Sequence, residues 1–385
     1  MRRVRPAGPA LTLAVGVTFA LAVVAPRASA EPVRPSTPSC DGEWNVMWSP
    51  NPASGRDVLE SVWADSRTNA WAVGDRSGSE PLIEHYTATG WHAVSAPTVE
   101  TRDDLHGVSG ESPTNVWAVG ESVLKSGVDQ TLIDHYDGTR WTHVASPEAV
   151  GGGPRLEAVS AGPNRPAWAV GYAVNIRPMI WGTVILEHKD GKWIHVHSPN
   201  PDYDNSLYGV RSVSPTLAWA VGDGDEDGGP SYPLIERWNG TSWSALTIPG
   251  LTDMEGGLTA VTTPTASTVL AVGGLSIPGV GAGPAAAYYD GSTWSVSIAP
   301  TDTSQVWSAS GDGKGGWWAV GDDTPVDSTS TSIEHGTGDT FARATSRDPS
   351  ANQGLKGVTQ SSGVSWAVGA RQAGTAAHTL VEYEC

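Results

Sequence analysis

The chain has 385 residues, a formal net charge of -18 at pH 7, 46 glycines, 28 prolines and two cysteines. A surplus of carboxylates repels the phosphates of nucleic acids and of anionic lipids, so the composition excludes both as expected partners. The many glycines and prolines fit a fold with numerous turns, and no stretch shows the apolar spacing of an amphipathic helix.

The first 30 residues have the pattern of a secretory signal peptide. Three arginines, Arg2, Arg3 and Arg5, precede an apolar run, and Ala28-Ser29-Ala30 is a cleavage site of the A-x-A type. We therefore expect a secreted, extracellular protein. Residues 31–39 are rich in proline and serine and are predicted to be a disordered leader. No later stretch is apolar for the length of a membrane span.

A tetrapeptide, Trp-Ala-Val-Gly, recurs along the rest of the chain. Six copies begin at Trp71, Trp117, Trp168, Trp219, Trp318 and Trp366, and a seventh has Leu270 in the place of tryptophan. Successive copies start between 46 and 51 residues apart. That period is the length of one four-stranded blade of a β-propeller.

Each repeat contains four short alternating runs, separated by turns of Gly, Pro, Asn and Asp. In order they are a Leu-x-small-Val run (strand a), the Trp-Ala-Val-Gly run (b), an alternating run (c) and a run that begins with tryptophan (d). Such sheets bury both faces only by stacking around an axis, so the sequence predicts an all-β, seven-bladed propeller with four antiparallel strands per blade. The expected blades are about 57–97, 104–147, 155–199, 206–249, 257–300, 305–346, and 355–385 plus 40–50.

The two ends of the domain 40–385 explain how the ring closes. The last repeat stops at Cys385 after three strands, and residues 40–50 match the missing strand d. The first strand is therefore expected to complete the last blade. Cys40 and Cys385 fall at this joint, and an exported protein is expected to form the disulfide between them. By the chain-entropy model it contributes roughly 5 to 6 kcal/mol. Two free buried thiols are the alternative.

These repeats resemble bacterial secreted seven-bladed β-propellers, most closely the Trp-Ala-Val-Gly repeat proteins with a kelch-like or sialidase-like outline. The resemblance covers the chain after Cys40. It implies the architecture and leaves the activity open, because unrelated functions are built on propellers.

Residues that recur in most blades are interpreted as packing residues. The tryptophans of strands b and d are expected to fill the space between blades. Acid-His pairs recur in strand c of four blades and are also assigned a structural role. These pairs are Glu84-His85, Asp134-His135, Glu187-His188 and Glu334-His335.

Residues that differ between the blades are the candidates for function. The longest loops, b to c and d to the next a, share one face, and each strand a starts there. The x position of Leu-x-small-Val changes in every blade and is predicted to form a polar ring at the channel mouth. The residues at x are Glu60, His106, Glu157, Tyr208, Thr259, Trp307 and Lys356. A hydrated channel entrance without a ligand is the alternative.

One loop has the spacing of a calcium site. Asp223, Asp225 and Asp227 alternate and are followed by Gly228, as in the first half of a calcium-binding loop. The twelfth position is Leu234 rather than glutamate. The hypothesis of bound Ca²⁺ stands beside the alternative of a solvated acidic loop.

The preferred functional hypothesis is a lectin-like binding module that recognises a glycan or another small surface ligand. Aromatic rings stack on sugars, and charged or amide side chains bind their hydroxyls. The expected ligand-binding residues are Arg102, Asp104, Tyr208, Trp307, Trp181, Gln305 and Gln353. We expect a monomer.

Two alternatives remain open. The first is a secreted lyase or hydrolase with its active site at the channel mouth. It would use His106 as acid or base, Glu60 and Glu157 as paired carboxylates, and Arg155 or Lys356 to stabilise an anionic intermediate. The second is a scaffold that binds another secreted protein.

Overall fold

The computed structural model describes residues 40, 42–53, 55–97, 102–147, 152–176, 179–227, 229–299, 304–323, 330–346 and 353–385. All of them belong to one compact unit, Arg34–Cys385. The predicted signal peptide (1–30) and leader (31–39) lie outside the described residues. None of the described segments is a helix with the length and apolarity needed to cross a membrane.

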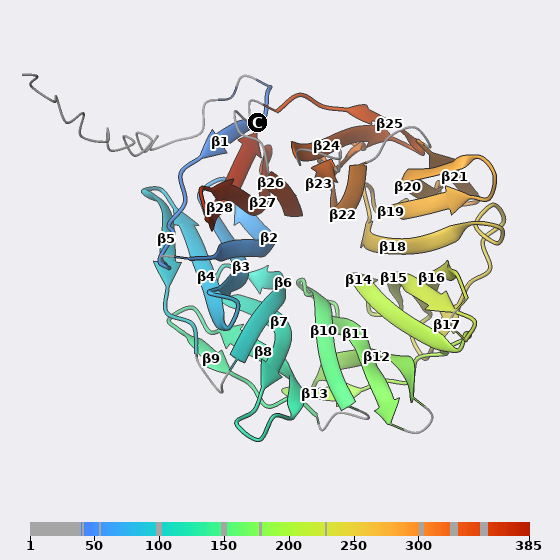
Figure 1. Cartoon of the computed structure of the whole chain (residues 1–385), viewed down its shortest axis with the longest axis horizontal. Coiled ribbons are helices and arrows are strands. Elements are labelled where there is room, and N and C mark those ends of the chain that lie inside the picture. Colours follow the sequence, from blue (N-terminus) through green and yellow to red (C-terminus); the bar gives the residue numbers. More distant parts are fainter. Residues whose placement is uncertain are drawn as a thin grey trace, which may run out of the picture. The chain divides into compact units, whose positions relative to one another are not determined.

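The described strands form seven four-stranded antiparallel sheets around a central axis, which confirms the predicted propeller (Figure 1). In the first four blades the strands, from the innermost outward, are β2 (Asp57–Ser66), β3 (Asn69–Arg76), β4 (Glu80–Thr87) and β5 (Gly90–Val94); β6 (Arg102–Ser112), β7 (Asn115–Val123), β8 (Asp129–Tyr136) and β9 (Trp141–His143); β10 (Gly152–Ser160), β11 (Ala167–Ile176), β12 (Met179–Lys189) and β13 (Lys192–His195); β14 (Asp204–Ser214), β15 (Leu217–Asp225), β16 (Ser231–Trp238) and β17 (Trp243–Ala245).

The other three blades follow the same order, and the chain's first strand closes the ring. Their strands are β18 (Glu255–Thr262), β19 (Val269–Ile277), β20 (Gly281–Tyr289) and β21 (Trp294–Ile298); β22 (Ser304–Gly311), β23 (Trp317–Asp323), β24 (Ser330–Thr337) and β25 (Thr340–Arg343); β26 (Gln353–Ser361), β27 (Val364–Ala373), β28 (Ala376–Glu384) and β1 (Asn45–Met47). In six blades the innermost strand begins one to three residues before the predicted blade boundary.

The joint of the last blade matches the prediction. β1 pairs antiparallel with β28, with Asn45 opposite Tyr383. Cys40 and Cys385 form a disulfide with their Cα atoms 4.8 Å apart. The bond ties together residues 345 positions apart in the sequence, so it fastens the first strand to the end of the chain.

Tryptophan pairs occupy the spaces between blades. In six pairs of neighbouring blades described here, the strand b tryptophan meets the strand d tryptophan of the next blade near a right angle, with ring centroids 5.1–5.8 Å apart. Edge-to-face geometry is the favoured arrangement of such rings. At the remaining interface Leu270 replaces the tryptophan and lies in one buried cluster with Trp317 and Phe341. The predicted packing role of the recurring tryptophans is thereby confirmed.

The strand c histidines pack on the same tryptophans. His85 stacks on Trp71 with centroids 3.8 Å apart, and His135 and His335 make similar contacts in their own blades. The assignment of Glu187-His188 to this position is wrong. In that blade the register is shifted by one residue, so Trp168 lies opposite Glu187 and not opposite the histidine. The c–d turn has the same length as in the first two blades, but the pair lies one residue later along strand c, so His188 lies opposite Trp193, where Tyr86 and Tyr136 lie opposite Trp91 and Trp141.

The acid of strand c is a buried carboxyl opposite the alanine of Trp-Ala-Val-Gly. It is buried in five blades, at Glu84, Asp134, Glu236, Glu334 and Glu382. The hydroxyl of Ser49 donates to the Glu84 carboxylate at 2.9 Å, and Ser198 does the same to Glu236. Burial raises the pKa of Glu84 to about 8 and that of Glu236 to about 7, because a dry interior disfavours the charged form.

The free energy of unfolding is therefore expected to fall as the pH rises from about 4.5 to 8. Between about pH 4.5 and 8 the folded protein keeps a proton on Glu84 that the unfolded chain releases, so the free energy of unfolding decreases with pH. In Glu84→Gln this contribution is gone. The Tm of the variant relative to wild type should rise by several degrees from pH 5 to pH 8, measured by thermal melts. Exposed Glu80→Gln is the control, and a pH-independent difference for E84Q would contradict the prediction.

Candidate functional site

The residue at x is the extra residue of a β-bulge in every blade. The pairing of β6 with β7, for example, jumps between Leu105 and Gly107 and leaves His106 without a partner across the ladder. The same jump follows the first residue of the Leu-x-small-Val run in the other six blades. A bulge redirects the side chain of its extra residue. This local feature turns seven variable side chains toward the axis.

The glycine of Trp-Ala-Val-Gly makes room for the bulge. A Cβ atom at Gly120 would lie 1.8 Å from the carbonyl oxygen of Asp104, which is backbone and has no other rotamer. A Cβ atom added at the equivalent glycine of the other blades would lie 1.6–2.1 Å from a backbone oxygen of the innermost strand. The glycine of the repeat is therefore required by the close approach of two backbones.

Gly120→Ala should destabilise the protein strongly. The methyl group has to push the bulged backbone of β6 away, at a cost of about 3 kcal/mol in unfolding free energy. Denaturant unfolding measures the change. Gly274→Ala is the matched control, because a Cβ there meets nothing within 4 Å. Equal losses in the two variants would show that the close approach is unimportant.

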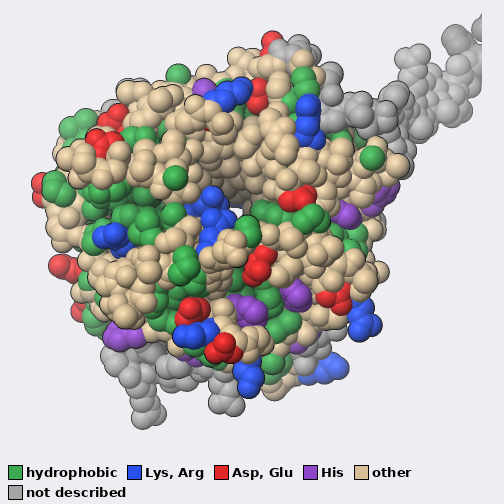
Figure 2. Space-filling view, turned by 180° about the vertical axis from the view of Figure 1, so that it is seen from behind, with side chains coloured by type: hydrophobic (Ala, Val, Ile, Leu, Met, Phe, Trp, Pro, Cys, Tyr) green, Lys and Arg blue, Asp and Glu red, His purple; other side chains and the backbone are tan. Residues whose placement is uncertain are grey.

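All seven x residues line two connected cavities at the centre of the ring. The outer one, here called the mouth pocket, has a volume of about 490 Å³, and the channel below it about 210 Å³. Seen from the side opposite to Figure 1, the ring is hollowed at its centre, and basic side chains lie in the hollow (Figure 2). The mouth pocket is thus the outer part of a passage through the propeller.

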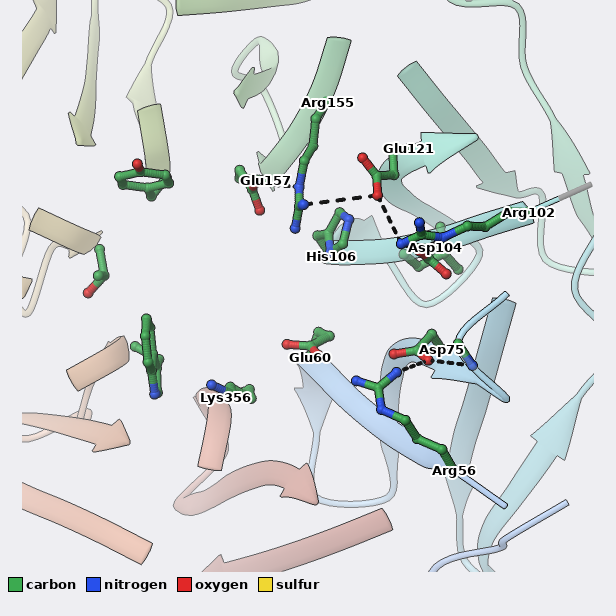
Figure 3. A pocket seen from close by; sticks show the side chains of 15 residues that line it. Arg56, Glu60, Asp75, Arg102, Asp104, His106, Glu121, Arg155, Glu157 and Lys356 are labelled. Carbon is green, nitrogen blue, oxygen red and sulfur yellow. Dashed lines mark hydrogen bonds and ion pairs between the residues drawn. The ribbon is translucent and has the colours of Figure 1, made fainter. Parts of the chain in front are cut away.

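Ion pairs connect the charged side chains on one side of the mouth pocket (Figure 3). Glu121 lies between two arginines, 3.3 Å from Arg102 and 3.9 Å from Arg155. Arg155 also contacts Glu157 at 2.6 Å, and Arg102 binds Asp104. Arg56 and Asp75 form a further pair. Most charges here neutralise each other.

Some polar groups in the pocket are left without a hydrogen-bond partner among the described residues, including the buried Oδ1 atom of Asp104. The buried Nε2 atom of His106 has no hydrogen-bond partner among the described residues. Glu60 is hydrogen-bonded to none of them either, although Lys356 and Arg56 act on its charge from a distance. Burial raises the pKa of Glu60. Burial, with the positive charges of Arg155 and Arg102, lowers the pKa of His106 to about 3, so its ring is neutral near pH 7.

His106 is expected to stay neutral from pH 5 to pH 8. Its imidazole resonances in an NMR pH titration should not move over this range, since the folded-state pKa lies well below it. His106→Gln identifies the resonances by their loss. A titration midpoint near 6.5 would show that the ring is solvated and that the positive charges of Arg102 and Arg155 do not lower its pKa.

The opposite side of the mouth pocket is aromatic. Lys356 lies over the ring of Trp307, with its Nζ atom 3.9 Å from the ring centroid, and also 3.9 Å from Asp322. The indole N–H of Trp307 donates to the same Asp322. The hydroxyl of Tyr208 donates to Asp223 at 3.1 Å. The carboxylates hold both rings in place at the edge of the pocket.

The structure brings together most of the predicted site residues. Nine line the mouth pocket, namely Glu60, Arg102, Asp104, His106, Arg155, Glu157, Tyr208, Trp307 and Lys356. Three predicted ligand-binding residues lie elsewhere. Trp181 lines a separate cavity, Gln305 a groove beside β18 and β19, and Gln353 a groove on the last blade.

Two acids of the mouth pocket were not predicted. Asp75 and Glu121 each follow the glycine of Trp-Ala-Val-Gly. The residue at this position also differs between blades, although aspartate holds it in three of the seven, so the sequence contains a weaker form of the same signal. A packing role for strand b does not by itself predict these two acids.

The predicted calcium loop contributes only in part to one cavity. Asp223 and Asp225 line it together with Trp181, whereas Asp227 is exposed. Among the residues that the structure describes, no group of three or more His, Cys, Asp or Glu side chains is arranged to hold a metal ion. Gly228 lies outside the described residues. Calcium binding stays a prediction from the sequence.

Comparisons with known proteins show the fold and no family. No protein-family model matches the chain, and no curated protein matches it. The finer resemblance to Trp-Ala-Val-Gly repeat proteins therefore stays a prediction.

Solved structures of other propellers match over most of the chain. YCF48 bound to a D1 peptide has a TM-score of 0.55 at 13% identity, covering 91% of this chain and 98% of that one. The WD40 propeller domain of Doa1 has 0.55 at 11% identity, over 86% and 94%. The propeller domain of the Trilobed protease from Pyrococcus furiosus has 0.53 at 9% identity, over 84% and 94%. At these identities the likeness concerns the fold alone.

Proposed function

We propose that this protein is an exported, lectin-like binding module that holds a sugar of a glycan in the mouth pocket. The observation that carries the proposal is that Glu60 and His106 are left open in a pocket where ion pairs neutralise most of the charge. Glu60 offers an acceptor, and the neutral His106 ring offers a nitrogen that accepts or donates according to its tautomer. Hydroxyl groups donate and accept, so a sugar satisfies both.

The charge balance of the pocket supports a neutral ligand. Its lining contains four cationic side chains, Arg56, Arg102, Arg155 and Lys356, and five carboxylates, Glu60, Asp75, Asp104, Glu121 and Glu157. A strongly charged ligand would have to break ion pairs to enter. A neutral polyol needs only the open groups and the outer lone pairs of the carboxylates.

The aromatic side offers a platform for a sugar ring. Trp307 and Tyr208 border the same cavity. Lys356 lies over one face of Trp307, so a stacked sugar uses the other face or displaces the ammonium group. The volume of about 490 Å³ suits one or two sugar residues.

The test begins with a glycan array of the purified protein, with calcium and again with a chelator. We expect saturable binding of a sugar that persists with the chelator. In calorimetry with that sugar, Glu60→Gln and His106→Ala should each bind at least about tenfold more weakly, because a buried hydrogen-bonding group is then missing or unpaired. Glu80→Gln, an exposed acid near the same face, should bind like wild type.

A blank array under both conditions would contradict the sugar proposal. The ligand class to examine next is a peptide, since YCF48, a propeller of similar outline, was solved with one. Unchanged affinity in Glu60→Gln and His106→Ala would show that the sugar binds outside the mouth pocket.

Catalysis in the same pocket is the second candidate, favoured by the raised pKa of Glu60 beside an unpaired imidazole. A carboxyl whose pKa is raised by burial and a neutral imidazole are the kinds of group that acid–base chemistry uses. With its pKa near 3, His106 would serve as the base. Product formation from the bound sugar that is lost in His106→Ala even at a saturating sugar concentration would identify an enzyme.

A further inference from the structure

A second cavity lies beside the mouth pocket, between the third and fourth blades. It has a volume of about 290 Å³ and is lined by Tyr172, Trp181, Asp204, Ser206, Tyr208, Asp223, Gly224, Asp225 and Ser231. Its walls come from strands β11, β12, β14, β15 and β16. We call it the aromatic–acidic pocket. It shares only Tyr208 with the mouth pocket.

Three aromatic rings form one part of its wall. Tyr172 meets Trp181 at 79° with ring centroids 5.2 Å apart, and meets Tyr208 at 78° with centroids 6.3 Å apart. The Tyr172 ring is therefore nearly perpendicular to both the Trp181 ring and the Tyr208 ring. Trp181 is 40% exposed, so part of this residue is accessible from solvent.

Three carboxylates form the rest of the wall. Asp204 accepts a hydrogen bond from the backbone N–H of Trp181, and Asp223 accepts one from the hydroxyl of Tyr208. Asp225 lies in the same lining. The acids thus hold the two rings that face them. None of the described residues that line this pocket is a lysine, arginine or histidine.

Further acids surround this pocket. Burial raises the pKa of Asp202, and repulsion by Glu226 and Asp225 raises it further. Burial also raises the pKa of Asp223, and Asp225 acts in the same direction. The aromatic–acidic pocket therefore concentrates negative charge that no basic side chain in its lining relieves. The mouth pocket, in which acids and bases are nearly equal, differs in this respect.

We propose that the aromatic–acidic pocket binds an organic cation, an ammonium or guanidinium group such as that of a lysine or arginine side chain. The negative faces of aromatic rings attract such cations, and carboxylates add a direct charge interaction. The enclosed volume accepts the head and part of the stem of a basic side chain. This site is distinct from the proposed sugar site and does not depend on it.

The aromatic lining favours an organic cation over calcium. A calcium ion takes six to eight oxygen ligands. Here the carboxylates share the pocket with three rings, and the described residues contain no group of acids arranged for a metal. Rings cannot coordinate calcium, whereas they are favourable neighbours of an ammonium or guanidinium group.

Calorimetry or NMR with small probes tests the proposal on the whole protein. The probes are Nα-acetyl-lysine amide, Nα-acetyl-arginine amide and, as the uncharged counterpart of similar shape, Nα-acetyl-norleucine amide. Calcium chloride is titrated separately. We expect saturable binding of one or both cationic probes, weakened by added salt, and roughly tenfold weaker or undetectable binding of norleucine amide.

Variants then locate the binding. Asp223→Asn and Trp181→Leu should each weaken the cationic probe roughly tenfold, the first by removing charge and the second by removing the ring while keeping apolar bulk. Trp181→Phe, which keeps an aromatic face, should lose less than Trp181→Leu. Asp253→Asn, an exposed acid outside the pocket, should bind like wild type, and thermal melts check that each variant is folded.

Several results would overturn the proposal. Equal binding of norleucine amide would show a merely apolar pocket. If calcium bound and neither cationic probe did, the pocket would be a metal site. If neither calcium nor any probe bound, the pocket would not be a binding site for any of these ligands. Glu60→Gln changes the mouth pocket alone, and Trp181→Leu changes the aromatic–acidic pocket alone. Each variant therefore tests one proposal, and one proposal can fail while the other holds.

Discussion

The close approach between the glycine of Trp-Ala-Val-Gly and the bulged innermost strand is the contact on which the site depends. With no Cβ at Gly120, the carbonyl of Asp104 comes to where a methyl group would stand. This allows the bulge, and the bulge turns His106 into the channel. Seven repetitions of one backbone contact therefore build a ring of seven side chains whose identities are free to vary.

Packing and function are assigned to different positions of the same repeat. The tryptophans of strands b and d join each blade to the next, and the strand c histidines cover them. These residues recur because every interface has the same shape. The x position faces the central opening instead, and of the residues that follow Trp-Ala-Val-Gly, Asp75 and Glu121 also line the mouth pocket. Variation between blades is concentrated at such positions.

The two pockets differ in how their charges are balanced. In the mouth pocket Glu121 lies between Arg102 and Arg155, so the charged groups largely satisfy one another. In the aromatic–acidic pocket Asp204 accepts a hydrogen bond from the N–H of Trp181 and Asp223 accepts one from the hydroxyl of Tyr208, and none of the described lining residues is basic. A neutral polar ligand suits the first and a cation suits the second. Tyr208 lines both pockets.

The sequence by itself determined the seven blades, the strand order, the closure by residues 40–50 and the Cys40–Cys385 bond, because repeat period and alternation are local properties of the chain. It also identified the x residues. Only the tertiary structure decided that Asp75 and Glu121 join the mouth pocket, that Glu187 is out of register, and that Trp181 lies with Asp223 rather than with Trp307. These outcomes depend on pairing across strands and on contacts between blades, where a shift of one residue reverses the face that a side chain occupies.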